Sequence, residues 1–198
     1  MLDTIFPIVE GHGEISAVPE LLRRLAHEEF RNYQLEVMRP FRLPRGRILA
    51  DAGLEKAVEL GARKLAADGR TGAILVLLDA DDDCPAVLAP ALLQRITAVK
   101  PSLSSSVVIA KAEYESWFLA SAVSLRGKNS VRADANPPSN PESIRDAKGH
   151  LERELFVRDA KYSETIDQVS LTASMDFVEA RRCPSFEKLY RDMSRLLP

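Results

Sequence analysis

Acidic side chains follow three of the four apolar segments of this sequence that have the composition of strands. They are Glu10 and Glu14 after residues 4–9, Asp79 and Asp81 after residues 73–78, and Glu113 and Glu115 after residues 107–110. Two unit charges about 4 Å apart repel by about 4 kcal/mol at an effective dielectric of 20. Protonation or a bound cation must therefore relieve the repulsion if these carboxylates meet. Oxygen ligands without histidine pairs suit Mg²⁺ or Mn²⁺, which can activate water for phosphodiester cleavage.

The stretch "VLLDADDDCP" contains aspartates that we expect to have different roles. Asp79 and Asp81 stand at the end of a strand, which favours a metal-ligand role, and Glu10 has the same position after the first strand. Asp82 and Asp83 are expected to form a solvated turn and to cap the helix that starts at Pro85. Glu14 has two interpretations, a site acid or a first-turn acid that favours the helix dipole.

Basic side chains near the same edge are candidate substrate contacts. Arg42 and Arg45 belong to the segment "MRPFRLPRGR", which is either a phosphate-contacting flap or a solvated loop. His12 lies between two glycines and is either a substrate or proton contact or an exposed loop histidine. Lys111 precedes the last pair of acids, where it could balance their charge or contact a phosphate.

The elements that would position these residues alternate between strand and helix along the first 120 residues. Strands are predicted at residues 4–9, 34–39, 73–78 and 107–110, and helices at 14–30, 50–67, 85–100 and 115–123. This alternation predicts an α/β fold, a Rossmann-like core of four mainly parallel strands flanked by helices. Right-handed crossovers place the carboxyl ends of all the strands at one edge, where ligands bind. Pro7 predicts that the first strand is irregular or lies near an edge.

The remaining third of the chain has a different pattern. Residues 124–141 are rich in Gly, Asn, Ser and Pro and predict a long loop, and helices are expected within 141–154, 162–169, 174–180 and 185–197. We therefore expect an α/β core at residues 1–124. Residues 125–198 would form a loop and a helical C-terminal extension packed on that core.

Composition narrows the class of protein. The chain has 198 residues and a net charge of -2, which argues against bulk attraction to nucleic acid and leaves room for a local basic groove. Cys84 and Cys183 have no CxxC partners and are expected to be free thiols in a reducing cytosol. The first residues lack a basic n-region, and no apolar run approaches a membrane span, so we expect a cytoplasmic protein without membrane contact.

The ordered motifs "IVEGHGE", "VLLDADDD", "AEYESWFLA" and "CPSFEKLYRDMSRLL" together resemble the bacterial family DUF4276, within the Toprim superfamily. The resemblance implies that Glu10 is a metal ligand or general acid/base and that Asp79 and Asp81 hold Mg²⁺. Further catalytic acids would be Glu14 and either Glu113 or Glu115. The resemblance also implies a separate ATPase partner in phage defence. No G-x-x-x-x-G-K-[ST] motif is present in the sequence, so such an ATPase would be another chain.

The first hypothesis is therefore a divalent-metal-dependent nuclease that acts on DNA or RNA with Mg²⁺ or Mn²⁺. The second is a non-catalytic binding or regulatory subunit with the same fold. A third is a phosphohydrolase of the haloacid-dehalogenase type, which D-x-D suggests. In those enzymes the nucleophilic aspartate usually follows the first strand, whereas the D-x-D of this chain follows the third.

Overall fold

A parallel five-stranded sheet forms the centre of the protein. The computed structural model describes residues 2–67 and 69–197. The strand order is β2-β1-β4-β5, and β3 also pairs with β1. The strands are β1 (Thr4–Val9), β2 (Glu36–Val37), β3 (Phe41–Arg42), β4 (Gly72–Asp79) and β5 (Ser104–Ala110). The predicted α/β class with a parallel sheet is confirmed, and the segment predicted as one strand at 34–39 is β2, with β3 as a further short strand.

Pro7 lies in β1, which is not itself an edge strand but is next to the edge of the sheet, in agreement with the prediction of a position near an edge. The Met38 N–H donates to the Ile5 carbonyl at 3.0 Å, and the Leu43 N–H donates to the Val9 carbonyl at 2.8 Å. Pro7 is two residues from both Ile5 and Val9, so its backbone nitrogen points to the same side of β1 as their carbonyl groups. On that side the hydrogen-bond ladder is interrupted, because β2 ends before Pro7 and β3 begins after it. The missing N–H of proline therefore falls where the sheet has no partner for it.

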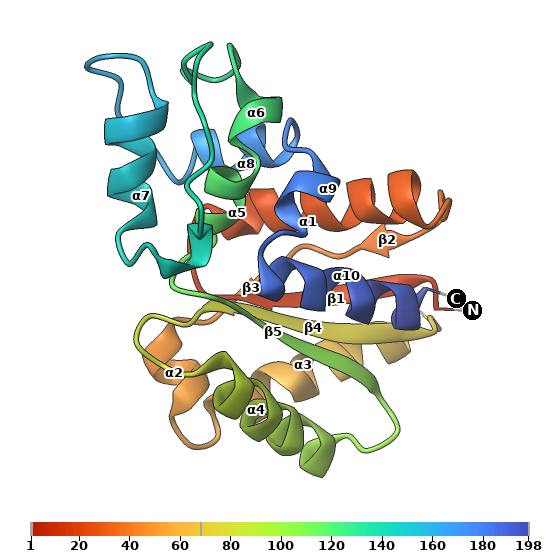
Figure 1. The fold of residues 1–198 in the computed structure, drawn as a ribbon. Coiled ribbons are helices and arrows are strands. Elements are labelled where there is room, and N and C mark those ends of the chain that lie inside the picture. The colour runs from red at the N-terminus through yellow and green to blue at the C-terminus, as the bar shows by residue number, and fades with distance from the viewer. Residues whose placement is uncertain (1, 68, 198) are drawn as a thin grey trace.

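One face of the sheet is covered by α3 (Gly53–Ala67) and α4 (Pro85–Val99) (Figure 1). Alternate strand residues point to this face and form a buried cluster with both helices. The strand members are Phe6, Ile8, Ile74, Val76, Leu78, Val107 and Ile109. The short helix α2 (Arg45–Leu49), which the sequence pattern did not reveal, leads from β3 toward α3.

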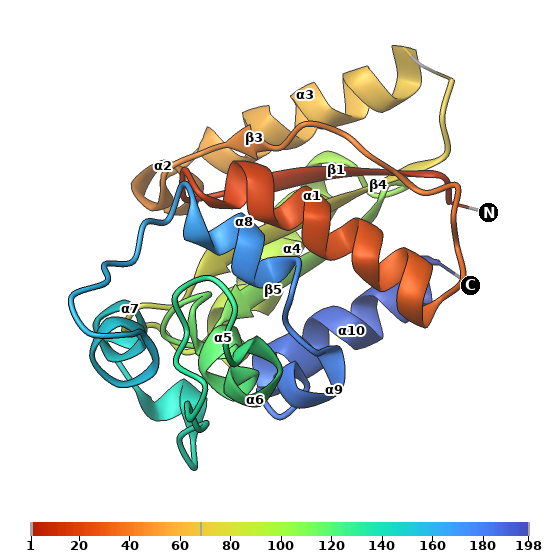
Figure 2. The same ribbon diagram turned by 90° about the horizontal axis from the view of Figure 1, so that it is seen from above.

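The other face is covered by helices from the start, middle and end of the chain (Figure 2). The first is α1 (Glu14–Arg24), which continues as the π-helix η1 (Leu25–Glu29). The short helices α5 (Ser116–Ala120) and α6 (Ala122–Leu125) and much of the C-terminal third cover the rest. That third contains η2 (Pro141–Ser143), α7 (Ala147–His150), η3 (Leu151–Leu155), α8 (Asp167–Thr172), α9 (Phe177–Ala180) and α10 (Pro184–Leu196). The helix expected within 141–154 is thus divided into η2, α7 and η3.

The C-terminal third packs on the rest of the protein through buried polar and apolar contacts. Trp117 Nε1 donates to Ser185 Oγ at 2.8 Å, and Ser106 on β5 donates a hydrogen bond to Asp192 on α10. Leu171, Phe186 and Leu189 belong to the same buried apolar cluster as the strand residues of this face. Within the described ranges, none of the helices combines the length and apolar character needed to cross a membrane.

Candidate active site

A cavity of about 280 Å³ opens at the carboxyl edge of the sheet. This edge is on the left in Figure 1. The lining includes six residues that the sequence marked as candidates: Glu10, His12, Glu14, Arg42, Arg45 and Asp79. It also includes Lys148 from α7, Glu164 from the loop before α8, and Gln168 from α8. The C-terminal third therefore forms one wall of the cavity.

The turn between β1 and α1 places Glu10 and Glu14 side by side. Glu14 Oε2 accepts hydrogen bonds from the N–H groups of Glu10 at 2.9 Å and Gly11 at 2.8 Å. The Glu14 side chain is thereby held back over the end of the strand, and the residue is only 3% exposed. Burial raises the pKa of Glu14 to about 7, although the two N–H groups oppose this. Burial also raises the pKa of Glu10.

Asp79 is the last residue of β4 and faces the same cavity. Its Oδ1 accepts a hydrogen bond of 2.8 Å from the N–H of Tyr114, in the segment that follows β5. Burial, together with the neighbouring charges of Glu14 and Glu115, raises the pKa of Asp79 well above its usual range. The parallel sheet thus brings acids from three strands together, as the strand directions predict.

Glu115 is the acid after β5 that joins this cluster. Its Oε1 accepts hydrogen bonds from Tyr162 Oη at 2.6 Å and Gln168 Nε2 at 3.2 Å. Burial raises its pKa. Glu113 has a different role: its Oε2 accepts a hydrogen bond of 3.0 Å from the Lys148 N–H and so anchors α7.

Lys148 brings a positive charge to the four carboxylates. Its Nζ lies 2.6 Å from Glu164 Oε1. Burial disfavours the charged form, but attraction to Glu115, Glu164 and Asp79 outweighs it, and the pKa of Lys148 is raised. Lys148 is therefore the counter-ion of Glu115 and Asp79, whereas Arg45 is the stronger cationic influence on Glu10. The sequence reasoning missed Lys148, Glu164 and Gln168 because no strand end precedes them.

Asp81 lies outside the cavity lining, although it was predicted as a metal ligand beside Glu10 and Asp79. Its side chain is 61% exposed and lies 3.3 Å from Arg45 Nε. Arg45 also donates to the carbonyl of Ala80 at 3.0 Å and to the carboxylate of Asp83. Asp81 has a φ of 47°, which places it in a left-handed turn directly after the strand.

The turn at Asp82 and Asp83 is exposed, as predicted, but neither side chain caps α4. Cys84 occupies the N-cap position without a side-chain hydrogen bond, and the Asp82 carboxylate pairs with Arg145. Cys84 is exposed and Cys183 is buried, and both are free thiols.

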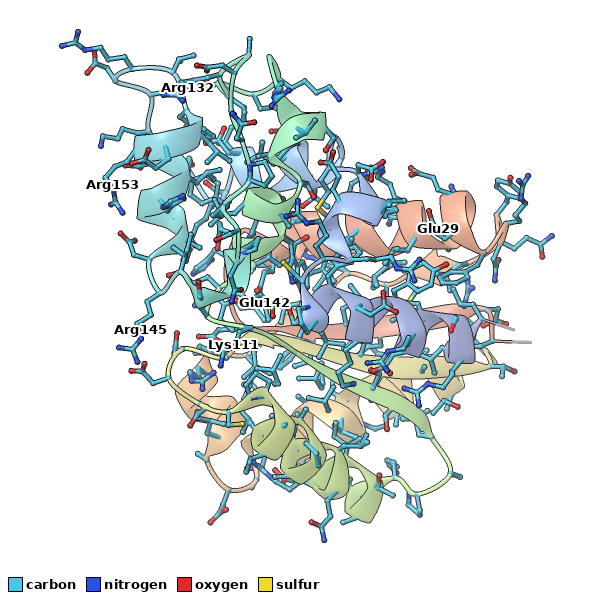
Figure 3. The ribbon with its side chains drawn as sticks, in the orientation of Figure 1. Glu29, Lys111, Arg132, Glu142, Arg145 and Arg153 are labelled. Atoms are coloured by element: carbon cyan, nitrogen blue, oxygen red, sulfur yellow. The ribbon has the colours of Figure 1, made fainter. Side chains whose placement is uncertain are left out.

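Lys111 is exposed and does not line the acidic cavity. Figure 3 shows it close to Glu142, at the side of the sheet edge nearest α4. Arg42 does line the cavity, and its buried Nε has no hydrogen-bond partner among the described residues.

The donor set of the cavity matches a hard divalent cation in its chemistry. Within residues 2–67 and 69–197, no three Asp, Glu, His or Cys side chains are already arranged to hold a metal ion. Two buried carboxylate oxygens, Glu10 Oε2 and Glu115 Oε2, nevertheless have no partner among the described residues. Unsatisfied buried oxygens are costly, and Mg²⁺ and Mn²⁺ prefer such oxygens as ligands.

The fold and the cavity define the class: a parallel-sheet α/β protein with a carboxylate cluster at the carboxyl edge of its strands. The family model of a domain of unknown function, DUF4276, matches residues 9–194. The chain belongs to the DUF4276 family. Comparison with curated proteins gave no match, and comparison with solved structures gave none either.

Proposed function

We propose that this protein is a divalent-metal-dependent nuclease with a Toprim-like core. The observation that carries the proposal is the convergence of Glu10, Glu14 and Asp79 on one cavity, with Glu115 buried behind its lining residue Gln168 and with raised pKa values for all four acids. Gathering acids at such a cost is typical of functional sites. A cation would relieve the repulsion and satisfy the two unpartnered carboxylate oxygens.

Glu10, Asp79 and Glu115 would hold Mg²⁺ or Mn²⁺, and Asp81 could join them by leaving Arg45. When bound, such an ion supplies an activated water and stabilises the leaving oxygen of a phosphodiester. Glu14 can hold or release a proton near neutral pH because its pKa is raised to about 7. Arg42 and Lys148 present positive charge to the cavity, where a phosphate of DNA or RNA would bind.

The test is cleavage of single-stranded and double-stranded DNA and RNA by the pure protein with Mg²⁺, with Mn²⁺ and with chelator. We expect metal-dependent cleavage that Asp79→Asn reduces by at least about a hundredfold. Asp82→Asn is the matched control, since Asp82 is exposed and pairs only with Arg145 among the described residues. Absence of cleavage under every condition, with and without an ATPase partner, would contradict the proposal.

A second candidate is a non-catalytic binding or regulatory subunit. Its support is the internal neutralisation of the acids, because Arg45 pairs with Asp81 and Asp83, and Lys148 lies among the buried carboxylates. Calorimetry with Mn²⁺ separates the two candidates. Saturable binding that Asp79→Asn removes supports the nuclease, and absence of binding supports the subunit.

The partner and the cell compartment are part of the same proposal. The Toprim resemblance suggests a separate ATPase chain and a role in phage defence in the cytoplasm. Co-expression of the chain with candidate ATPase chains, followed by co-purification, would test this association.

A further inference from the structure

A second cavity, of about 370 Å³, lies beside the end of β5 and between the amino ends of α4 and α10. Ile109, Ala89, Pro85 and Pro184 contribute to its lining, which is mostly apolar. It shares no lining residue with the acidic cavity. Its volume falls at the lower end of the range that small-molecule sites occupy.

Three cations from two segments also line this cavity: Lys111 after β5, and Lys188 and Arg191 on α10. Lys188 pairs with Asp192. Lys111 and Arg191 are exposed, and neither forms an ion pair within the part of the chain that the structure describes. The cavity therefore combines apolar walls with two exposed cations, Lys111 and Arg191, that have no ion-pair partner among the described residues.

The acid among the lining residues is Glu142, and it is already engaged. Glu142 Oε1 accepts hydrogen bonds from the Ser185 N–H at 2.9 Å and from Ser185 Oγ. The carboxylate of Glu142 thus lies against the amino end of α10, and the residue is only 9% exposed. Figure 3 shows Glu142 and Lys111 close together at this end of the sheet.

We propose that this cavity binds a small amphipathic carboxylate, with the apolar body against Ile109 and Ala89 and the anionic end toward Lys111 and Arg191. Charge complementarity selects an anion, and the apolar walls select a ligand with a hydrophobic body. A polynucleotide phosphate needs only exposed cations and would leave the apolar walls without a partner. The proposal does not depend on catalysis at the acidic cavity.

The experiment measures binding of octanoate to the full chain by calorimetry, with octylammonium as the probe of equal apolar size and opposite charge. We expect saturable binding of octanoate and at least about tenfold weaker binding of octylammonium. The double substitution Lys111→Glu and Arg191→Glu should weaken octanoate binding by about tenfold, because two surface attractions become repulsions. Lys128→Glu, at an exposed lysine outside the cavity, is the control and should leave binding unchanged.

The exposed thiol of Cys84 lines the cavity and supplies a second measurement on the unmodified protein. Octanoate should slow alkylation of Cys84 by iodoacetamide at the concentrations that saturate the calorimetric signal. Equal binding of both probes, or octanoate binding that the double substitution leaves unchanged, would overturn the proposal. Protection of Cys84 by a short oligonucleotide but not by octanoate would overturn it as well.

Discussion

Tyr162, in the loop before α8, donates a hydrogen bond of 2.6 Å to the buried carboxylate of Glu115. The two residues are separated by 47 positions in the sequence. Gln168 donates to the same oxygen, so two groups of the C-terminal third hold Oε1, while the buried Oε2 stays without a partner among the described residues. This arrangement fixes the orientation of Glu115 before any ligand binds.

Tyr162→Phe removes the shorter of these hydrogen bonds and keeps the ring. We expect the free energy of unfolding to fall by about 2 kcal/mol, because a buried carboxylate loses a donor. Urea denaturation monitored by circular dichroism measures the change. Tyr33→Phe is the control: Tyr33 is 67% exposed, and its substitution should change stability by less than about 0.5 kcal/mol. Equal effects of the two substitutions would contradict the assigned role of Tyr162.

The metal-free protein should lose stability as pH rises from about 4.5 to about 7. Burial raises the pKa of Glu14 from 4.5 to about 7, so the folded state binds this proton more tightly than the unfolded state. The stabilising contribution is complete below pH 4.5 and is lost as pH rises through 7; it amounts to about 3 kcal/mol.

Glu14→Gln should flatten this part of the stability profile, because glutamine does not titrate. The measurement is urea unfolding in chelator between pH 4.5 and 8. A parallel series with Glu28→Gln, an exposed acid in η1, controls for general charge effects. If Glu14→Gln, like the control Glu28→Gln, kept the wild-type dependence of unfolding free energy on pH, burial of Glu14 would not be the source of that dependence.

Lys148→Met should tighten Mn²⁺ binding by about tenfold, equivalent to about 1.4 kcal/mol. The lysine is a counter-ion of Glu115 and Asp79, so its removal eliminates a positive charge that would compete with the proposed metal ion. Calorimetry measures the affinity, and Lys128→Met, outside the cavity, is the control. Weaker Mn²⁺ binding in Lys148→Met would show that the lysine organises the acids more than it competes for them.

Gly13→Ala should destabilise the protein by about 1–3 kcal/mol through overpacking. A Cβ at Gly13 would lie 2.3 Å from Gln168 Oε1 and 2.3 Å from the Glu164 carbonyl oxygen. Gly13 therefore allows α8 to approach the start of α1. Gly46→Ala is the matched control, because its Cβ would meet nothing within 4 Å. Thermal unfolding of the two variants should separate them, with Gly46→Ala neutral or slightly stabilised.

Strand direction explains which parts of the site could be predicted from the sequence. The apolar runs before Glu10, Asp79 and Glu115 mark buried parallel strands, and parallel strands end at one edge. The position of Asp81 outside the cavity lining could not be predicted, because it depends on a turn with a positive φ and on the ion pair with Arg45. Neither property has a periodic signature in the sequence.

The residues that the C-terminal third contributes to the cavity could not be predicted from strand direction, because no strand directly precedes them. Lys148 lies on a four-residue helix, and Gln168 on a six-residue helix, both within a region of irregular structure. Their places depend on tertiary contacts such as the hydrogen bond from the Lys148 N–H to Glu113. Local sequence patterns carry no information about contacts of this range.

The division of the site between early and late parts of the chain has a consequence for biosynthesis. A ribosome that has released residues 1–124 has supplied the strands and all four clustered carboxylates, but neither Lys148 nor Tyr162. The nascent polypeptide therefore passes through a stage in which these acids have no internal counter-ion from α7. Competence for ligand binding at the carboxyl edge would then arise only as the last third of the protein emerges and folds.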